Sequence, residues 1–455
     1  MASNAAHLEP LGTLPWRWVR VWALHAWRHA TIRRAVIGIG WSLLGSGVTQ
    51  TLGLLAGIVC ARYLGRWEYG QLGVIVGAAN LFTALGVAGL GLTATKHVAE
   101  LRTTDPARAG RIIGMARNTA VVAGVVVAVA FIALADWLSQ RVLLAPQLAT
   151  PLRLSAGILF FSSLNGYQIG TLTGFEAFKA LAMANLVRGV ISFPLLVAGA
   201  VFGGLKGAVL ANVGMAAINW AAHAVVLHRQ CVEHRIRIDS SATAEDFRIL
   251  YRFSLPVLVA TMSSMPAIWL SNAALARNSG FGEVGIFSVA MQWQTAVLFL
   301  TNAAGNLGLP MLSSVAPERN IAKYRRVLGL NFLLTSGSAL VAAVPIAVAA
   351  PWIMRAYGTG FASGAKVLVV MVVSTVLSAM SIAVGHAIWS LDAPVAGMLF
   401  ALMRGCVLVF AATAFSRFGA IGLAAAHLIT MAVQTLTVIP YMIILLRRQA
   451  RTWSC

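Results

Sequence analysis

Apolar runs of about 20 residues recur along almost the whole chain, and they constrain its fold more than any other feature. A helix that crosses the hydrocarbon core of a bilayer needs about 20 predominantly apolar residues. We delimit twelve such runs and predict a transmembrane helix for each. They are residues 36–61, 69–92, 118–138, 154–174, 181–203, 207–228, 254–276, 284–310, 328–353, 367–390, 395–416 and 420–446. The pattern predicts an all-α integral membrane protein.

Composition supports this class. Hydrophobic residues make up 59% of the chain and charged residues 10%, whereas soluble domains carry about 25% charged residues. The hydrophilic stretches are all shorter than the roughly 50 residues of a small soluble domain. We therefore expect the activity to reside in the membrane-embedded part.

The net charge of +21 suggests nucleic acid at first, but the positions of the charges indicate a membrane topology. Lysines and arginines gather in both tails and in alternate loops, at residues 96–117, 229–252 and 319–326. Cytoplasmic loops of membrane proteins carry this excess, and attraction to anionic lipid adds to it. We expect both termini in the cytoplasm and no nucleic-acid partner.

A ten-residue stretch occurs twice, at residues 61–70 and 276–285, and each copy separates two apolar runs. A glycine just past a helix end can adopt the left-handed conformation that closes the helix, and a glutamate in the next first turn interacts favourably with the helix dipole. A sound helical turn alone would explain one copy, but two copies indicate a duplicated membrane unit. With a constant shift of 215, the shared residues are Ala61 and Ala276, Arg62 and Arg277, Gly65 and Gly280, Glu68 and Glu283, and Gly70 and Gly285.

The repeat sets the expected domains. Arg188 and Gly189 match Arg404 and Gly405 with a shift of 216. Because six is an even number of spans, both copies would have the same orientation in the membrane. The two copies would then be related by an axis along the membrane normal, with a substrate path between them. The predicted segments are an N-terminal segment (1–35), an N-lobe (36–228), a cytoplasmic linker (229–253), a C-lobe (254–446) and a basic cytoplasmic tail (447–455).

The N-terminal segment holds four tryptophans on one broad helical face and arginines on the other. This pattern is typical of a helix that lies on the membrane surface, and a disordered basic tail is the alternative. The tryptophans are Trp16, Trp18, Trp22 and Trp27.

Arg188 and Arg404 are the most informative candidates for a binding site. Each lies about two turns inside its predicted span, where an arginine is costly and usually faces a cavity or a partner. Two guanidinium groups that face a central cavity would offer bidentate donors to phosphate. Snorkelling to the headgroups is the alternative. No carboxylate lies mid-span, so the pattern favours an anionic substrate over a cation.

Uncharged polar residues within the predicted spans are candidates for contacts with sugar hydroxyls, although hydrogen bonds between helices explain most residues of this kind. The candidates are Asn80, Asn165, Gln292, Asn302 and Asn306. Trp293 could stack on a sugar face or contact lipid. Three membrane histidines could handle protons or serve as structural hydrogen-bonding groups; they are His223, His386 and His427.

The sequence contains no recognised catalytic motif. Its scattered cysteines have no metal-binding spacing and are interpreted as free thiols; they are Cys60, Cys231, Cys406 and Cys455. We expect no cofactor and no metal, and coupling of transport to H⁺ or Na⁺ stays open.

Residues 33–446 resemble the bacterial polysaccharide flippases of the multidrug/oligosaccharidyl-lipid/polysaccharide exporter superfamily. The resemblance rests on the two six-span halves, the repeated turn at 61–70 and the basic loop from Lys96 to Arg117. It implies two lobes, as in MATE transporters, that alternate access. It also implies a cargo of oligosaccharide on a polyprenyl diphosphate carrier, and the family's cationic cavity maps here onto Arg188 and Arg404 alone.

The leading hypothesis is therefore an inner-membrane flippase for O-antigen, lipopolysaccharide or exopolysaccharide precursors, not an enzyme. Its expected partners are the lipid-linked oligosaccharide and membrane lipids, with a polymerase or export complex left open. A multidrug or cation antiporter of the same superfamily is the main alternative. A glycan polymerase or ligase usually exposes a larger outer loop, and a peptidoglycan-precursor flippase usually has two further spans.

Overall fold

The computed structural model describes residues 30–87, 89–239, 265–305, 308–391 and 393–453. These residues form helices joined by short turns and contain no strand. The helices are α2 (Ala30–Val87), α3 (Leu90–Leu101), α4 (Pro106–Trp137), α5 (Ala149–Gly174), α6 (Phe178–Glu233), α8 (Met265–Ser279), α9 (Phe281–Gly305), α10 (Gly308–Val315), α11 (Ile321–Ala356), α12 (Ala365–Ser390), α13 (Pro394–Phe415) and α14 (Gly419–Trp453). Single π or 3₁₀ turns occur at η1 (Leu138–Val142), η2 (Pro146–Leu148), η3 (Ala316–Glu318), η4 (Thr359–Gly364) and η5 (Ser416–Phe418). The predicted N-terminal interfacial helix and most of the predicted linker lie outside the described residues.

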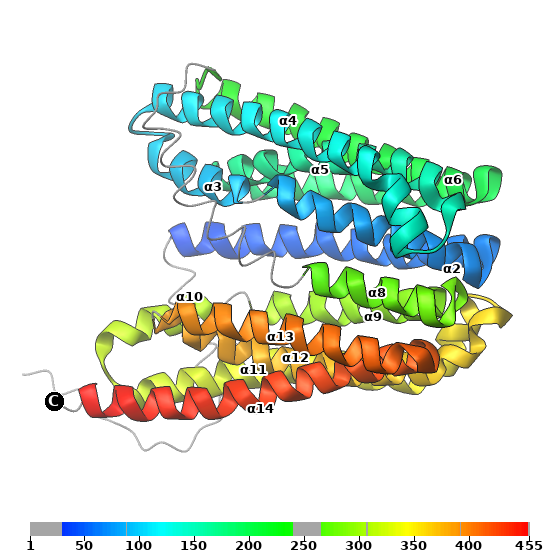
Figure 1. The fold of residues 1–455 in the computed structure, drawn as a ribbon. Helices are drawn as coiled ribbons and strands as arrows, with labels where there is room; N and C mark the ends of the chain where they lie inside the picture. Colours follow the sequence, from blue (N-terminus) through cyan, green and yellow to red (C-terminus); the bar gives the residue numbers. More distant parts are fainter. Residues whose placement is uncertain (1–29, 88, 240–264, 306–307, 392, 454–455) are drawn as a thin grey trace, which may run out of the picture.

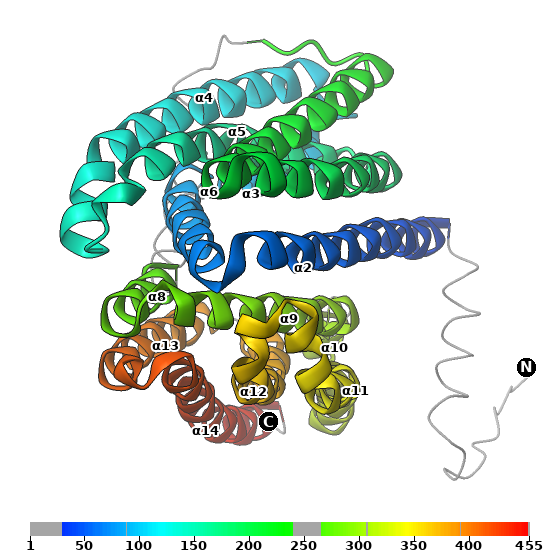
Figure 2. The same ribbon diagram turned by 90° about the vertical axis from the view of Figure 1, so that its right-hand side faces the viewer.

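The helices form two bundles, α2 to α6 and α8 to α14, for which we keep the names N-lobe and C-lobe (Figure 1). An end-on view shows α2 of the N-lobe beside α9 of the C-lobe at the boundary between the bundles (Figure 2). These two helices make the most extensive contact between the lobes. Any path between the lobes must therefore border α2 and α9.

The helices identify a multi-pass membrane protein. Seven helical stretches among the described residues are long and apolar enough to cross a membrane. Several of them contain two of the predicted spans. In α2 and α6 this is because each helix reverses direction at an internal glycine. Gly65 has φ of 69° and Gly204 has φ of 53°, values that glycine adopts without the steric cost that other residues incur. The expected twelve crossings and the cytoplasmic termini stay predictions.

One predicted span, 69–92, is broken in the structure. It is divided where α2 ends at Val87 and α3 begins after Gly89, whose φ is 75°. Glycine lowers helix propensity by about 1 kcal/mol relative to alanine. The apolar run continues through this break, so hydropathy alone does not detect it. Another predicted span, 284–310, includes residues 306 and 307, which lie outside the described residues.

The helix of the third predicted span begins earlier than expected. It starts at Pro106 rather than near residue 118, and Asp105 caps it by accepting a hydrogen bond from the Arg108 N–H at 2.9 Å. Proline at the first helical position and aspartate before it are both favoured there. Much of the predicted basic loop from Lys96 to Arg117 is therefore helical.

The repeated turns of the two lobes contact each other reciprocally. A Cβ atom on Gly70 would collide with the carbonyl oxygen of Phe281, and one on Gly285 would collide with that of Arg66. Residues 66 and 281 are themselves equivalent under the shift of 215. The Trp67 ring meets the Phe281 ring edge-on, with centroids 5.6 Å apart. The last glycine of each repeat thus allows the two backbones to approach across the lobe boundary.

The repeated glutamates serve a second helix of their own lobe. The Ala420 N–H, at the start of α14, donates a hydrogen bond to Glu283 Oε2 at 2.8 Å. The Glu68 carboxylate lies beside Gly204, where the second arm of α6 begins. A carboxylate at a helix N-terminus satisfies free N–H groups and interacts favourably with the dipole. Each glutamate therefore ties the repeated turn to the last long helical arm of its lobe.

We predict that Gly70→Ala and Gly285→Ala each destabilise the protein by about 1–3 kcal/mol, because the added methyl group meets rigid backbone atoms of the other lobe. The measurement is thermal unfolding of the purified protein in detergent. Gly337→Ala is the matched control, since a Cβ there meets no atom within 4 Å and alanine favours the helix. A Gly70→Ala protein as stable as the control would contradict the role of this contact.

Candidate functional site

Gln292 of α9 links the two lobes at the end that carries the repeated turns. Its Oε1 accepts hydrogen bonds from the Tyr69 hydroxyl at 3.3 Å and the Tyr357 hydroxyl at 3.0 Å. Its Nε2 donates to the Gly53 carbonyl at 3.0 Å. Tyr69 and Gly53 belong to the N-lobe, whereas Gln292 and Tyr357 belong to the C-lobe. The amide therefore joins the lobes through two hydrogen bonds and is held within its own lobe by a third.

Tyr357 is fully buried next to this amide and accepts a hydrogen bond from Trp293 Nε1 at 3.2 Å. Burial raises the pKa of the Tyr357 hydroxyl above its ordinary range, so the group keeps its proton and can donate to Gln292. The rings of Tyr69 and Tyr357 both contact Phe361, with centroids 6.1 Å apart in each case. Polar and aromatic contacts thus close this end of the lobe boundary.

Arg62, the arginine of the first repeat, adds another link between the lobes. Its Nε donates to the carbonyl oxygen of Ala356 at 2.6 Å. Ala356 ends α11, and a cation favours the negative end of a helix dipole. The corresponding Arg277 borders a cavity of about 320 Å³ that is also lined by Val142 of the N-lobe. Both arginines of the repeat therefore lie where the lobes meet.

Arg188 belongs to a polar cluster inside the N-lobe. His223 is fully buried, and its Nδ1 lies 2.6 Å from Asn165 Oδ1. The Arg188 guanidinium lies within electrostatic range of His223. Arg188 Nε and His223 Nε2 have no hydrogen-bond partner among the described residues, and neither has Oδ1 of Asn219, which lies one turn before His223 on α6. Unpaired buried polar atoms are costly, so this cluster has capacity for further polar contacts.

Arg404 occupies the equivalent place in the C-lobe and borders a cavity of about 250 Å³. The residues that line this cavity all belong to α12, α13 and α14, and Trp389, Ser381 and Gln434 are among them. Gln434 Oε1 is buried without a hydrogen-bond partner among the described residues. Gln434 follows Asn219 by 215 residues. Each lobe therefore places an amide on its last long helical arm and an arginine on the helix before it.

The structure groups some of the predicted site residues and separates others. It brings Asn165 to His223, which lies within electrostatic range of Arg188, and it places Gln292 at the contact between the lobes. Arg188 and Arg404 lie in different lobes, in separate polar environments. Asn80 of α2 and Asn302 of α9 are exposed, and Asn306 lies outside the described residues.

The remaining predicted histidines lie within the C-lobe. His386 lies close to both Gly305 at the end of α9 and Gly308 at the start of α10. His427 is buried with its ring 5.4 Å from that of Phe287. Within the described residues, neither histidine is hydrogen-bonded to the Gln292 network.

Sequence reasoning did not identify Tyr69 and Tyr357 as functional candidates. A signal for Tyr69 was available, because it lies inside the first repeated stretch beside Gly70. Tyr357 had no comparable signal, since it occurs after the end of an apolar run. Only the fold brings the two hydroxyls to one amide.

The acidic residues of the described segments lie at helix ends or in turns, as Glu68, Asp136 and Glu283 illustrate. None of the buried polar or charged side chains in these segments is a carboxylate. The same segments contain no group of three or more His, Cys, Asp or Glu residues that could hold a metal ion. Arg188 and Arg404, by contrast, are partly buried within these segments.

Comparison with solved structures identifies the fold. The chain superimposes on an inward-facing multidrug resistance MATE family transporter of the MOP superfamily with a TM-score of 0.78 and 16% identity, covering 90% of this chain and 99% of that one. It also resembles the lipid II flippase MurJ in an inward closed conformation, with a TM-score of 0.70 and 11% identity over 90% of each chain. The two-lobe arrangement is that of MOP superfamily transporters.

Comparison of sequences identifies the family. The EPS I polysaccharide export inner membrane protein EpsE of Ralstonia nicotianae is 27% identical over 293 residues. This match covers 63% of the chain and 64% of the relative, just under two thirds of its length. The family model described as polysaccharide biosynthesis protein matches residues 35–316, more than half of the chain. The chain therefore belongs to the polysaccharide biosynthesis protein family.

Proposed function

We propose that the protein is a flippase that moves lipid-linked oligosaccharide across a bacterial inner membrane during the synthesis of surface polysaccharide. Membership of the polysaccharide biosynthesis protein family is the observation that carries this proposal. Similarity to EpsE, a polysaccharide export inner membrane protein, supports it. The proposed cargo is an oligosaccharide on a polyprenyl diphosphate, and the protein acts as a transporter rather than an enzyme.

The partly buried arginines support an anionic cargo. Arg404 lines one cavity with the amide of Gln434, and Arg188 lies within electrostatic range of His223 in the N-lobe. Guanidinium groups suit phosphate oxygens, and amides can pair with sugar hydroxyls. A cation antiporter of the same superfamily is the second candidate, favoured by the MATE neighbour's fold. A desolvated carboxylate for the cation is absent from the described helix interiors.

The lobe contacts support transport by alternating access. The repeated turns and the Gln292 network hold the lobes together at one end of the bundle. Translocation requires this end to open after the headgroup has entered between the lobes, while the lipid tail stays in the bilayer. Rocking of two pseudo-symmetric units about a central path is the expected motion. We further propose that an H⁺ or Na⁺ gradient supplies the energy and that the protein works beside a polysaccharide polymerase.

The first test concerns the leaflet in which the carrier accumulates. In a strain deleted for this gene, we expect the lipid-linked oligosaccharide to accumulate in a form protected from an impermeant glycosidase added to the periplasm. Restoring the gene should restore access. If the carrier is reached equally well in the deletion strain, the flippase assignment is wrong, and cation-dependent drug efflux becomes the measurement to make.

The arginine pair provides a second prediction. Arg188→Ala combined with Arg404→Ala should lower translocation at least tenfold, because about 1.4 kcal/mol of lost binding already corresponds to a factor of ten. The measurement is the fraction of the lipid-linked oligosaccharide that the periplasmic glycosidase reaches, compared between strains that contain equal amounts of inserted protein. Replacement of both arginines by lysine should retain part of the activity, since lysine keeps the charge but loses the planar pair of donors.

Arg141→Ala combined with Arg355→Ala is the matched control for the arginine test. Both residues are exposed and end the helices of the third and ninth predicted spans. We expect this pair to leave translocation unchanged. Normal translocation by the Arg188 and Arg404 variant would show that the buried arginines do not bind the cargo.

The Gln292 network provides a third prediction. Gln292→Leu removes two hydrogen bonds between the lobes, each worth about 0.5–1.5 kcal/mol, together with the one from Tyr357, and should shift the protein toward the state that is open at this end. Spin labels are attached at positions 206 and 417, which lie near turns of the two lobes in place of Lys206 and Arg417. Opening of this end should appear as an additional, longer distance between the two labels. Gln449→Leu, which changes an amide near the end of α14, is the control. An unchanged distance distribution in Gln292→Leu would exclude a closing role for the network.

A further inference from the structure

A groove of about 690 Å³ lies between the two arms of α6. Because α6 reverses at Gly204, residues near 183–187 of the first arm lie beside residues near 222–226 of the second. Met183, Val187 and Val225 form its walls and are about half exposed, at 45%, 46% and 54%. All residues that line the groove belong to the N-lobe. The groove is thus an apolar surface feature of one lobe rather than a space between the lobes.

Two basic side chains border one end of this groove. Lys179 begins the first arm of α6 and Arg229 lies near the end of the second, and both are exposed. Glu176 also borders the groove, but its carboxylate pairs with Arg102 at 2.7 Å. Glu233, one turn beyond Arg229, accepts a hydrogen bond from Gln230 at 2.9 Å. The groove therefore combines apolar walls with a cationic mouth.

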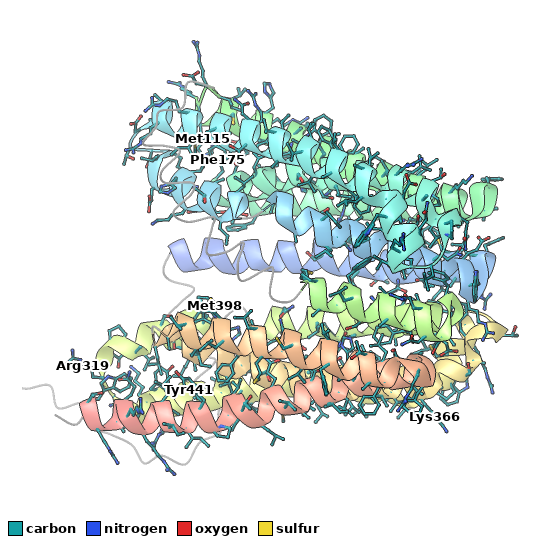
Figure 3. The ribbon with its side chains drawn as sticks, in the orientation of Figure 1. Met115, Phe175, Arg319, Lys366, Met398 and Tyr441 are labelled. Carbon is teal, nitrogen blue, oxygen red and sulfur yellow. The ribbon has the colours of Figure 1, made fainter. Side chains whose placement is uncertain are left out.

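The mouth lies at the end of the molecule where headgroups of one leaflet are expected. Figure 3 shows Phe175, which precedes the mouth in sequence, at the same end as Arg319, with Lys366 at the opposite end. The basic segments that the sequence assigns to the cytoplasmic side, such as residues 319–326, lie at this same end. Basic pockets between membrane helices bind the headgroups of anionic lipids.

We propose that this groove is a binding site for an anionic glycerophospholipid. One acyl chain lies along Met183, Val187 and Val225, and the phosphate contacts Lys179 and Arg229. The lining contains few groups that could hold a glycan, because Gln230 is its one uncharged polar side chain. This chemistry favours a phospholipid of the surrounding leaflet over the oligosaccharide carrier.

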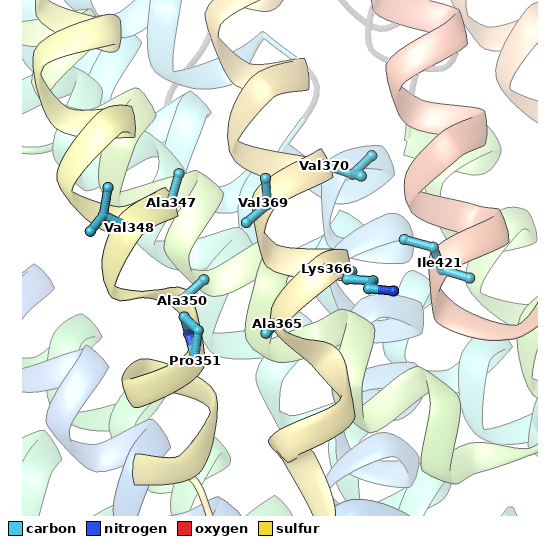
Figure 4. A pocket seen from close by; sticks show the side chains of 9 residues that line it. All are labelled: Ala347, Val348, Ala350, Pro351, Ala365, Lys366, Val369, Val370 and Ile421. Atoms are coloured by element: carbon cyan, nitrogen blue, oxygen red, sulfur yellow. The ribbon is translucent and has the colours of Figure 1, made fainter.

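A second groove in the C-lobe provides an internal comparison. It has a volume of about 510 Å³ and lies between α11, α12 and the start of α14 (Figure 4). Its walls are also apolar, with Val348, Val369 and Ile421 among them, and Lys366 is the one charged residue that lines it. Apolar walls alone accept any acyl chain, so selection for anionic lipid requires the two cations at the N-lobe groove.

The test measures lipid selectivity directly. Purified protein is exchanged into micelles that contain phosphatidylglycerol and phosphatidylcholine with identical acyl chains, and bound lipid is counted by native mass spectrometry. We expect the wild-type protein to retain phosphatidylglycerol at least tenfold better. Lys179→Gln combined with Arg229→Gln should reduce this preference at least fivefold. Lys366→Gln combined with Arg355→Gln removes the same charge elsewhere and should preserve it.

A second variant tests the groove itself. Ala222→Leu adds volume at the groove lining while leaving both cations in place, and it should reduce retention of phosphatidylglycerol. Thermal unfolding confirms that the variant is folded. Equal selectivity in the Lys179 and Arg229 variant, or equal loss in the control pair, would overturn the proposal. So would effective competition by free glycerol phosphate, or displacement of phosphatidylglycerol by a lower concentration of polyprenyl diphosphate.

Discussion

The close approach of two backbones at the repeated turns is the contact on which the rest of the lobe boundary depends. Gly70 lies against the Phe281 carbonyl, and Gly285 lies against that of Arg66. Inside a membrane, helices gain little from the hydrophobic effect, and small residues stabilise their association by allowing close packing. This approach sets α2 beside α9 and brings Tyr69 within hydrogen-bonding distance of Gln292.

Much of the helical architecture follows from the sequence because the bilayer restricts the chain to helices or closed barrels. The apolar runs at 154–174 and 367–390 coincide closely with α5 and α12. The break after Val87 could not be predicted from hydropathy, because hydropathy indicates whether a helix lies in the bilayer and not whether the helix is continuous. The early start of α4 had a local signal in Asp105 and Pro106, but the charged residues that follow it suggested a loop.

The candidate site was predicted in its residue types but not in its connections. Gln292 was expected to contact sugar, whereas the structure joins it to Gly53, Tyr69 and Tyr357, which lie between 65 and 239 residues away in sequence. Such partners are set by tertiary packing alone. The shift of 215 contained one further usable signal, since it relates Asn219 to Gln434 in the same way that it relates the repeated turns.

The reciprocal glycine contact also bears on how this architecture is assembled. A surface patch that meets its own equivalent about a twofold axis is isologous, the arrangement found in symmetric homodimers. The two halves of this chain meet as two subunits would, although a single polypeptide joins them. Covalent linkage then frees the halves to diverge, so that His223 in one lobe corresponds by the same shift to Val438 in the other. The two lobes therefore pack as the subunits of a symmetric dimer do, while equivalent positions in them carry different side chains.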